Sequence, residues 1–310
     1  LERSRYLGIP ISLRKLMANG HTPFCDVITD PDLSAEQQNE VFRLVMQLDS
    51  VDLLQLGKVP DDGPLARFII DEASSRNPRV GIKESLVTPL VRVGGSWDHF
   101  FKARSRKFRK NFNNKLNRFN KEKGFTIRCE KIESRQHPCI QEMVDISANS
   151  WKRHVGNDLG SNIAGREFLM RMADTLGPAG NVSLWIMHKD GEPVAYECHI
   201  ECEGIVYPVR ADYAENFKAY SPGSILEYTA LKALFDGGEV RQYYSCADDY
   251  WYLKNWTNES KRHLNIEVFS ESLKGQLLYN LEYRLVAGLR TARDKLKKTQ
   301  DDDRVRVAKP

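Results

Sequence analysis

Three strand-like runs follow one another between residues 182 and 213, and they constrain the fold more than any other feature of the sequence. The runs cover 182–190, 192–201 and 204–213. Asp190-Gly191 and Glu203-Gly204 separate them, and such pairs are typical of tight hairpin turns. The sequence therefore predicts three antiparallel strands in succession in the second half of the chain.

A polar loop and a helix follow the third strand. The pattern predicts a helix over 222–236 that ends at Gly237-Gly238, with Ser221 as its N-cap. Gly223 falls in the first turn, where glycine costs helix stability, so we expect a ligand to approach this backbone closely. Because a helix N-terminus attracts anions, the turn is a candidate phosphate site, and an ordinary Ser-Pro-Gly helix start is the alternative.

The rest of the chain alternates strands and helices, which indicates an α/β fold. Strands are expected at 25–29, 51–59, 81–93, 125–132, 239–245 and 265–270. Helices are expected at 34–49, 63–76, 96–123, 137–153, 163–176 and 271–297. Ser34 is the predicted N-cap of the first of these helices.

The length and composition of the chain limit the number of domains and the kinds of partner that we expect. A chain of 310 residues favours two domains, and a net charge of +4 does not by itself indicate a nucleic-acid-binding protein. The sequence has no apolar run of 18 residues, so no membrane span is expected.

Six cysteines without a CxxC pair indicate reduced thiols and a cytoplasmic location. Because the chain begins with Leu, we expect it to be part of a longer one.

One alternative reading of the cysteines is a metal site. Cys198 and Cys202 are four residues apart, with His199 between them. On a strand, however, the two cysteines share one face and His199 points to the other. No metal is therefore expected.

Several short motifs occur in a characteristic order. They are Gly191, Pro193-Val194-Ala195, Ala211, Tyr213, Lys218, Tyr220-Ser221-Pro222-Gly223, Leu226, Tyr252, Trp256 and the basic stretch 104–119. With these residues the chain resembles, over roughly 25–275, the acetyltransferase-like GNAT proteins of the CelD/BcsL type, which accompany cellulose and exopolysaccharide synthesis. The architecture is also similar to that of the Fem-type aminoacyl transferases. Leu253 stands where the family has Lys, and only Gly223 remains of the usual glycine-rich pyrophosphate loop.

The resemblance implies two GNAT-like units, each a mixed sheet flanked by helices. Residues 1–133 would form the first unit with the basic helix, 134–298 the catalytic unit, and 299–310 a disordered tail. The implied activity is transfer of an acyl group from acetyl-CoA or another acyl-CoA, without a metal, to an amine or hydroxyl of an amino sugar, polysaccharide precursor or amino acid. The implied cofactor-binding residues are Lys218, Tyr220, Ser221, Gly223 and Ser224.

Two alternatives stay open. The acyl donor would be an aminoacyl-tRNA if the chain works as the Fem-type enzymes do. A GNAT-like protein that has lost CoA binding would instead be a binding module in a polysaccharide machine.

Acyl transfer needs a group that takes the proton of the acceptor, and three acids lie near the ends of the strands that splay in GNAT-like enzymes. These are Asp212, Asp248 and Asp249; capping of the loop is the alternative role for the last two. Tyr252 is a candidate proton donor to the departing thiolate, or a member of a buried aromatic cluster. Glu197 and His199 are expected to point outward from their strand, where they are candidates for contact with the acceptor.

The predicted helix 96–123 is strongly basic. From Lys102 to Lys123 there are ten Lys or Arg residues and one acid, Glu122. Phe108, Phe112 and Phe119 fall on one face, which should pack into the protein. The opposite face, which should include Arg104, Lys107, Lys110 and Lys115, would contact a phosphorylated acceptor, an acidic membrane surface or RNA, unless it is merely solvated.

Overall fold

The computed structural model describes residues 2–286 apart from 17, 19, 20, 49, 77, 78, 249 and 251. The chain forms two compact units. Unit 1 comprises Leu1–Leu86 and Arg262–Pro310, and unit 2 comprises Val87–Lys261. The structure thus divides the chain at residues other than the predicted 133/134: the basic helix and the strand that follows it belong to unit 2, and the chain returns to unit 1 near its end. The predicted tail 299–310 lies outside the described residues.

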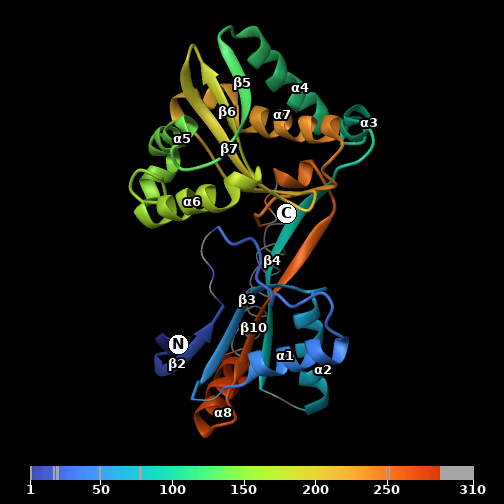
Figure 1. The fold of residues 1–310 in the computed structure, drawn as a ribbon, viewed down its shortest axis with the longest axis vertical. Coiled ribbons are helices and arrows are strands. Elements are labelled where there is room, and N and C mark those ends of the chain that lie inside the picture. The colour runs from blue at the N-terminus through green and yellow to red at the C-terminus, as the bar shows by residue number, and fades with distance from the viewer. Residues whose placement is uncertain are drawn as a thin grey trace, which may run out of the picture. The chain divides into compact units, whose positions relative to one another are not determined.

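Unit 1 is a mixed sheet with helices (Figure 1). Its strand order is β1-β2-β3-β10-β4. The strands are β1 (Glu2–Tyr6), β2 (Ile9–Lys15), β3 (Leu53–Pro60), β4 (Val80–Arg92) and β10 (Ser260–Phe269), and the helices are α1 (Ala35–Met46), α2 (Pro64–Arg76) and α8 (Leu273–Asn280). Strands β2 and β3 are parallel, whereas β3 and β10 are antiparallel. Ser34 caps α1 through a capping box with Gln37, as predicted.

Unit 2 contains the predicted run of antiparallel strands. Its strand order is β4-β9-β8-β7-β6-β5. The strands are β5 (Phe125–Lys131), β6 (Val182–Lys189), β7 (Glu192–Cys202), β8 (Ile205–Tyr213) and β9 (Gln242–Tyr244). Asp190-Gly191 and Glu203-Gly204 have positive φ at both residues, as the favoured two-residue hairpin turns require. Because β9 is parallel to β8, the sheet is mixed, and the predicted α/β class is confirmed.

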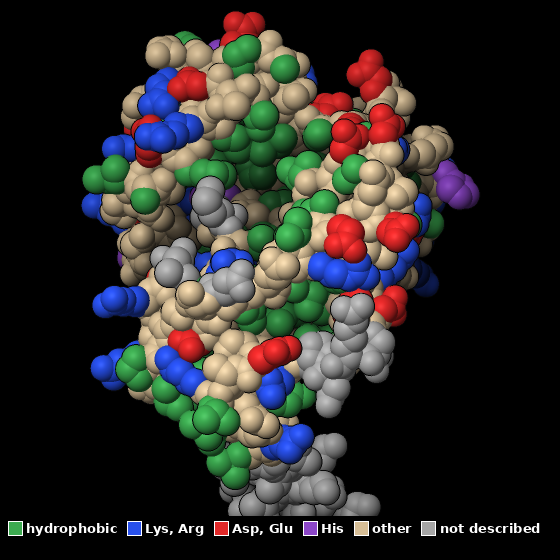
Figure 2. Space-filling model, turned by 60° about the horizontal axis from the view of Figure 1, so that its bottom comes forward, with side chains coloured by type: hydrophobic (Ala, Val, Ile, Leu, Met, Phe, Trp, Pro, Cys, Tyr) green, Lys and Arg blue, Asp and Glu red, His purple; other side chains and the backbone are tan. Residues whose placement is uncertain are grey.

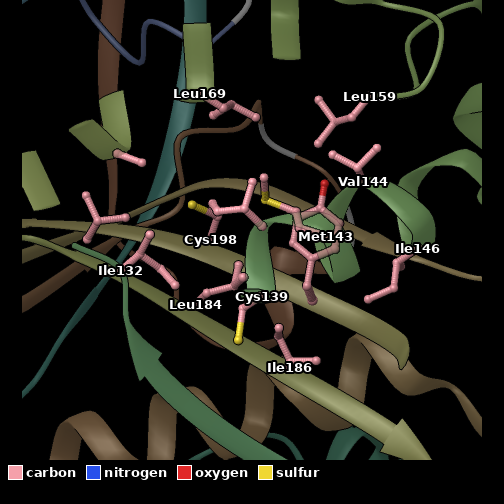
Figure 3. Packing of buried hydrophobic residues seen from close by; sticks show 14 of the residues in the cluster. Ile132, Cys139, Met143, Val144, Ile146, Leu159, Leu169, Leu184, Ile186 and Cys198 are labelled. Carbon is pink, nitrogen blue, oxygen red and sulfur yellow. The ribbon is translucent and has the colours of Figure 1, made fainter. Parts of the chain in front are cut away.

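Helices cover both faces of the unit 2 sheet (Figure 1). The helices α5 (Pro138–Ala148) and α6 (Ile163–Leu176) cover one face, and α4 (Arg106–Lys121) and α7 (Pro222–Gly237) the other. Figure 3 shows the core under α5, in which side chains of Met143, Leu184 and Cys198 point toward one another. On the other face, Ile225 and Leu226 of α7 pack on Ala195 of β7. Two opposed cores therefore fix the orientation of every side chain along β7 and β8.

Several predicted elements differ from the observed ones. Residues 25–29 form no strand, and the hairpin of β1 and β2 was not predicted. The basic segment is two helices, α3 (Trp97–Lys102) and α4, because Ser105 caps α4 and starts it anew. Beyond α8 a π-helical turn covers Leu281–Val286, and the rest of the predicted helix 271–297 lies outside the described residues.

The surface is mixed in charge. Figure 2 shows basic and acidic side chains interspersed on one face, with hydrophobic side chains between them. All six cysteines are free thiols. No helix in the described part of the chain is long and apolar enough to cross a membrane.

Candidate functional site

The start of α7 leaves its backbone donors uncapped. Ser221 occupies the N-cap position in a left-handed conformation, φ 56°, and its side chain makes no capping hydrogen bond to any described residue. The prediction that Ser221 caps the helix is therefore wrong, and its own N–H donates to the Lys218 carbonyl at 3.0 Å. Because no side-chain cap is present there, the N–H groups of Gly223 and Ser224 in the first turn are available to an anion.

Gly223 is not required by the fold itself. Its backbone is helical, and a Cβ added there would lie 3.6 Å from Tyr213 Cδ1, an ordinary contact distance. The packing around Gly223 therefore does not by itself demand glycine. The predicted close approach of a ligand stays a prediction.

Two cations of α4 reach this turn. Lys115 Nζ donates to Ser224 Oγ at 3.1 Å, and Arg118 Nη1 donates to the Ala219 carbonyl at 2.9 Å. Burial lowers the pKa of Lys115, and the neighbouring Glu227 opposes that shift. Lys218, predicted for the same site, is exposed beside the turn. The first turn of α7 is therefore surrounded by positive charge.

The remaining predicted cofactor residue, Tyr220, packs against Phe125 at the start of β5. Its ring contacts that of Phe125 edge-on, with centroids 5.3 Å apart. Tyr220 thus anchors the loop that carries Lys218 and Ser221. Its predicted contact with a cofactor stays a prediction.

Strands β8 and β9 are paired over only a short part of their length. In the described part of the chain they pair through Ile205 with Gln242 and Val206 with Tyr243, whereas β8 continues to Tyr213. Beyond Val206 and Tyr243, no further pairing between described residues of the two strands is present. Such a gap offers backbone donors to a carbonyl group that enters it.

Asp212 lies on the other face of the sheet. It accepts hydrogen bonds from Ser147 Oγ at 2.8 Å and Arg210 Nε at 3.0 Å, and it forms an ion pair with Lys152. Its side chain is fully buried. This network joins β8 to α5, and it accounts for a buried acid without any catalytic role; the predicted role of Asp212 in catalysis stays a prediction.

The other predicted catalytic residues follow β9. Asp248 is exposed, and its Oδ1 accepts a hydrogen bond from the Val87 N–H of β4 at 3.3 Å; its predicted role as the base stays a prediction. Asp249 lies outside the described residues. Tyr252 stacks on Tyr250 with centroids 5.8 Å apart, and burial, followed by the charge of Glu227, raises the pKa of Tyr252. It therefore keeps its proton at neutral pH, as a proton donor must.

A group of buried polar residues lies on the α7 face, and the sequence patterns did not identify it as a unit. Glu197 accepts hydrogen bonds from Tyr243 Oη at 2.6 Å and pairs with His199 Nε2 at 2.8 Å. Both Glu197 and His199 are buried, so the prediction that they point outward is wrong. Glu227, on the second turn of α7, faces the same group. Burial, followed by the Glu197 charge, raises the pKa of Glu227 to about 8.

A small pocket opens beside Glu227. Its lining consists of Pro89, Val91, Glu227, Tyr243, Ser245, Leu253, Trp256 and Thr257. The Ser245 hydroxyl is buried and has no hydrogen-bond partner among the described residues. Trp256 hydrogen-bonds to Glu227. The only signal in the sequence was the position of this acid, one helical turn after Gly223.

The comparison with protein families identifies the region that holds these features. Residues 106–254 match the family described as an acetyltransferase (GNAT) domain. This stretch of the chain is similar to a GNAT domain. It begins at α4 and ends after β9, so it includes the basic helix, the turn before α7 and the gap between β8 and β9. This supports the GNAT superfamily, while the CelD/BcsL type is a finer assignment that stays a prediction.

Solved structures share the fold at low sequence identity. A conserved protein of unknown function from Bacteroides thetaiotaomicron has a TM-score of 0.53 at 12% identity, covering 75% of each chain. The C-terminal domain of a putative lysylphosphatidylglycerol synthetase from Agrobacterium fabrum has a TM-score of 0.52 at 11% identity, covering 78% of this chain and 76% of that one. FemX has a TM-score of 0.50 at 12% identity, covering 80% and 79%. No curated protein matches the sequence.

Proposed function

We propose that the protein is an acyltransferase that takes its acyl group from acetyl-CoA or another acyl-CoA and transfers it to an amine or hydroxyl of a small acceptor. The observation that carries this proposal is the first turn of α7, where N–H groups without a side-chain cap lie near the Lys115 ammonium and Gly223 carries no side chain. Such a turn suits the pyrophosphate of CoA, which is a diffuse, doubly ionised anion.

The residues fit this co-substrate in three places. Gly223 and Ser224 would supply backbone N–H groups, Lys115 and Lys218 would supply positive charge, and the gap between β8 and β9 would receive the thioester. There a backbone N–H would stabilise the negative charge that develops on the carbonyl oxygen. Holding donor and acceptor in one cleft supplies much of the rate enhancement, because a bimolecular step becomes effectively unimolecular.

A second donor, aminoacyl-tRNA, is favoured by one observation. The outer face of α4 exposes Arg106, Lys107, Lys110 and Lys121, and it adjoins the α7 turn through Lys115 and Arg118. A row of cations beside an anion site suits a phosphate backbone. The third possibility, a binding module, requires that neither donor binds.

Isothermal titration distinguishes the three. The protein is titrated with acetyl-CoA and, separately, with purified aminoacyl-tRNA. The proposal predicts saturable binding of acetyl-CoA and no specific requirement for the tRNA. Binding of aminoacyl-tRNA alone would support the second donor, and binding of neither would leave the binding-module interpretation. Because six free thiols are present, a reducing compartment such as the cytoplasm is the proposed location.

A further inference from the structure

The outer side of α8, and of the π-helical turn that follows it, carries a row of leucines. Leu273 is 86% exposed, Leu277 52% and Leu285 56%, and Leu281 between them is partly buried. They recur every four residues, close to the length of one helical turn, so they follow one side of the helix. We call these four residues the leucine stripe. Single exposed leucines are ordinary, whereas an apolar row along one helix marks an interaction surface.

The π-helical turn keeps the last leucine in line with the others. A repeat of four residues drifts slowly around an α-helix, because four residues slightly exceed one turn. From Leu281 to Val286 the chain is π-helical, and a π-helical turn holds more residues than an α-helical one. Over this segment four residues advance by less than one turn, which offsets the drift and keeps Leu285 on the side of Leu277. Such turns are frequent at functional sites.

The inner side of the same segment is fixed on the unit 1 sheet. Leu278 is fully buried. Tyr283 lies directly over Gly81, where an added Cβ would be 1.8 Å from the tyrosine ring. The buried Glu282 carboxylate forms an ion pair with Lys83, with 2.7 Å between Oε1 and Nζ. Because these contacts hold the helix in one orientation, the leucine stripe is a preformed surface that needs little reordering when a partner binds.

Each end of the leucine stripe has one exposed charge, and the two charges are opposite. Glu271 lies at the N-terminal end and Arg284 at the C-terminal end. Neither forms an ion pair with any other residue that the structure describes. The cation between them, Lys274, is already paired with Asp52 at 2.8 Å. The segment therefore offers a partner an acidic end, an apolar middle and a basic end.

We propose that the leucine stripe binds the same stripe of a second copy of this chain, with the two helices antiparallel about a two-fold axis near Leu277. Leu273 would then face Leu281 of the partner subunit, and Glu271 would face Arg284 of the partner subunit. Each contact occurs twice, as two-fold symmetry requires. A parallel arrangement would instead bring like charges together at both ends, which costs free energy. The inference does not depend on the acyltransferase function proposed above.

A second copy suits this surface better than a membrane or a nucleic acid does. A helix that binds an anionic bilayer or a phosphate backbone needs a cluster of Lys or Arg beside its apolar side. Between residues 271 and 286 the exposed charges are one acid and one cation, which balance one another and match an inverted copy of themselves. Because one pair of short helices buries less surface than a standard interface of roughly 1,200–2,000 Å², we expect a weak dimer that dissociates on dilution.

Analytical ultracentrifugation of the full chain, from about 1 μM to about 1 mM, tests the surface. A reducing agent keeps the free thiols from forming cross-links. Wild type is compared with Leu277→Glu and with Leu44→Glu, which changes a leucine of α1 that is 61% exposed and lies outside the stripe. We expect wild type and Leu44→Glu to form dimers reversibly. Leu277→Glu should stay monomeric, because two carboxylates would meet at the two-fold axis. A monomeric wild type, or equal association of all three proteins, would overturn the inference.

Reversal of the end charges tests the antiparallel orientation without changing a leucine. Glu271→Arg and Arg284→Glu should each weaken the dimer by roughly threefold or more, because each brings like charges together at two places. The double variant, in which opposite charges face one another again, should regain most of the affinity of wild type. Both positions are exposed, so urea unfolding should show stabilities close to that of wild type. A double variant that associates no more tightly than the single variants would overturn the antiparallel arrangement.

Discussion

Lys115 of α4 donates a hydrogen bond to Ser224 in the first turn of α7, across 109 residues of sequence, with 3.1 Å between Nζ and Oγ. The contact joins the basic helix to the proposed phosphate turn. Lys115 is therefore not one of the freely solvated cations of α4. Arg104, predicted to share that face, is also engaged: its guanidinium donates to the Trp256 carbonyl and lies over the Phe100 ring at 4.6 Å.

Lys115→Gln should weaken acyl-CoA binding, because it removes a positive charge at the turn. We expect a loss of roughly three- to tenfold, equivalent to about 0.7–1.4 kcal/mol, and a smaller dependence on salt. The control is Lys110→Gln on the exposed side of the same helix. Equal acyl-CoA affinities for the two variants would mean that Lys115 supports only the packing of α4 on α7.

The exposed cations of α4 distinguish acceptor binding from tRNA binding. Arg106, Lys107 and Lys110 are replaced together by Gln, which should leave stability within about 0.5 kcal/mol per residue. We predict unchanged acetyl-CoA affinity, with a higher KM for an anionic acceptor that varies less with salt. If aminoacyl-tRNA affinity instead collapses and its salt slope shrinks by about one per lost phosphate contact, then α4 binds tRNA.

Asp212 should matter for stability before it matters for chemistry. Asp212→Asn leaves Arg210 and Lys152 with an uncompensated buried charge, and breaking such a network costs about 3–5 kcal/mol. Urea unfolding measures the loss, with Asp248→Asn as the exposed control, expected within about 0.5 kcal/mol of wild type. A stable Asp212→Asn protein that binds acetyl-CoA but no longer turns over would restore the catalytic role predicted from the sequence.

Glu227 should make stability depend on pH. Burial raises its pKa from 4.5 to about 8 in the folded protein, so between these values the folded state holds a proton that the unfolded state releases. Its contribution is therefore fully present below about pH 4.5 and is lost as the pH rises through about 8. We predict that the free energy of unfolding of wild type falls relative to that of Glu227→Gln over this range. If the free energies of unfolding of the two proteins change in parallel with pH, then the pKa of Glu227 is that of an ordinary carboxyl group.

Local signals in the sequence predicted much of unit 2. The turn residues Asp190-Gly191 and Glu203-Gly204 set the three strands to within about one residue, because both pairs adopt the positive φ that ends a strand sharply. Likewise, Phe112 packs in the core as its helical spacing predicts. These features depend on neighbouring residues, which a sequence shows directly.

The unpredicted features depend on contacts between distant residues. Val268 pairs with Leu54, and this long-range pairing returns the end of the chain to unit 1, which no local pattern indicates. Glu227 looks like a solvated helix residue until Glu197 and Trp256 are known to face it. The surroundings of Glu227 were therefore not apparent in the sequence, whereas Asp248 was conspicuous because it follows a strand, and it accepts a hydrogen bond from the Val87 N–H.

The central claim is that the first turn of α7 binds the phosphates of an acyl-CoA at Gly223. Isothermal titration of acetyl-CoA into wild type, Gly223→Val and Gly237→Val tests it most directly. Gly237 is the matched control, at the other end of the same helix and with open space around it. We predict that Gly223→Val weakens binding more than tenfold, by at least about 1.4 kcal/mol, while Gly237→Val binds as wild type and all three proteins remain folded. Wild-type affinity in Gly223→Val, or no binding by the wild type, would contradict the claim.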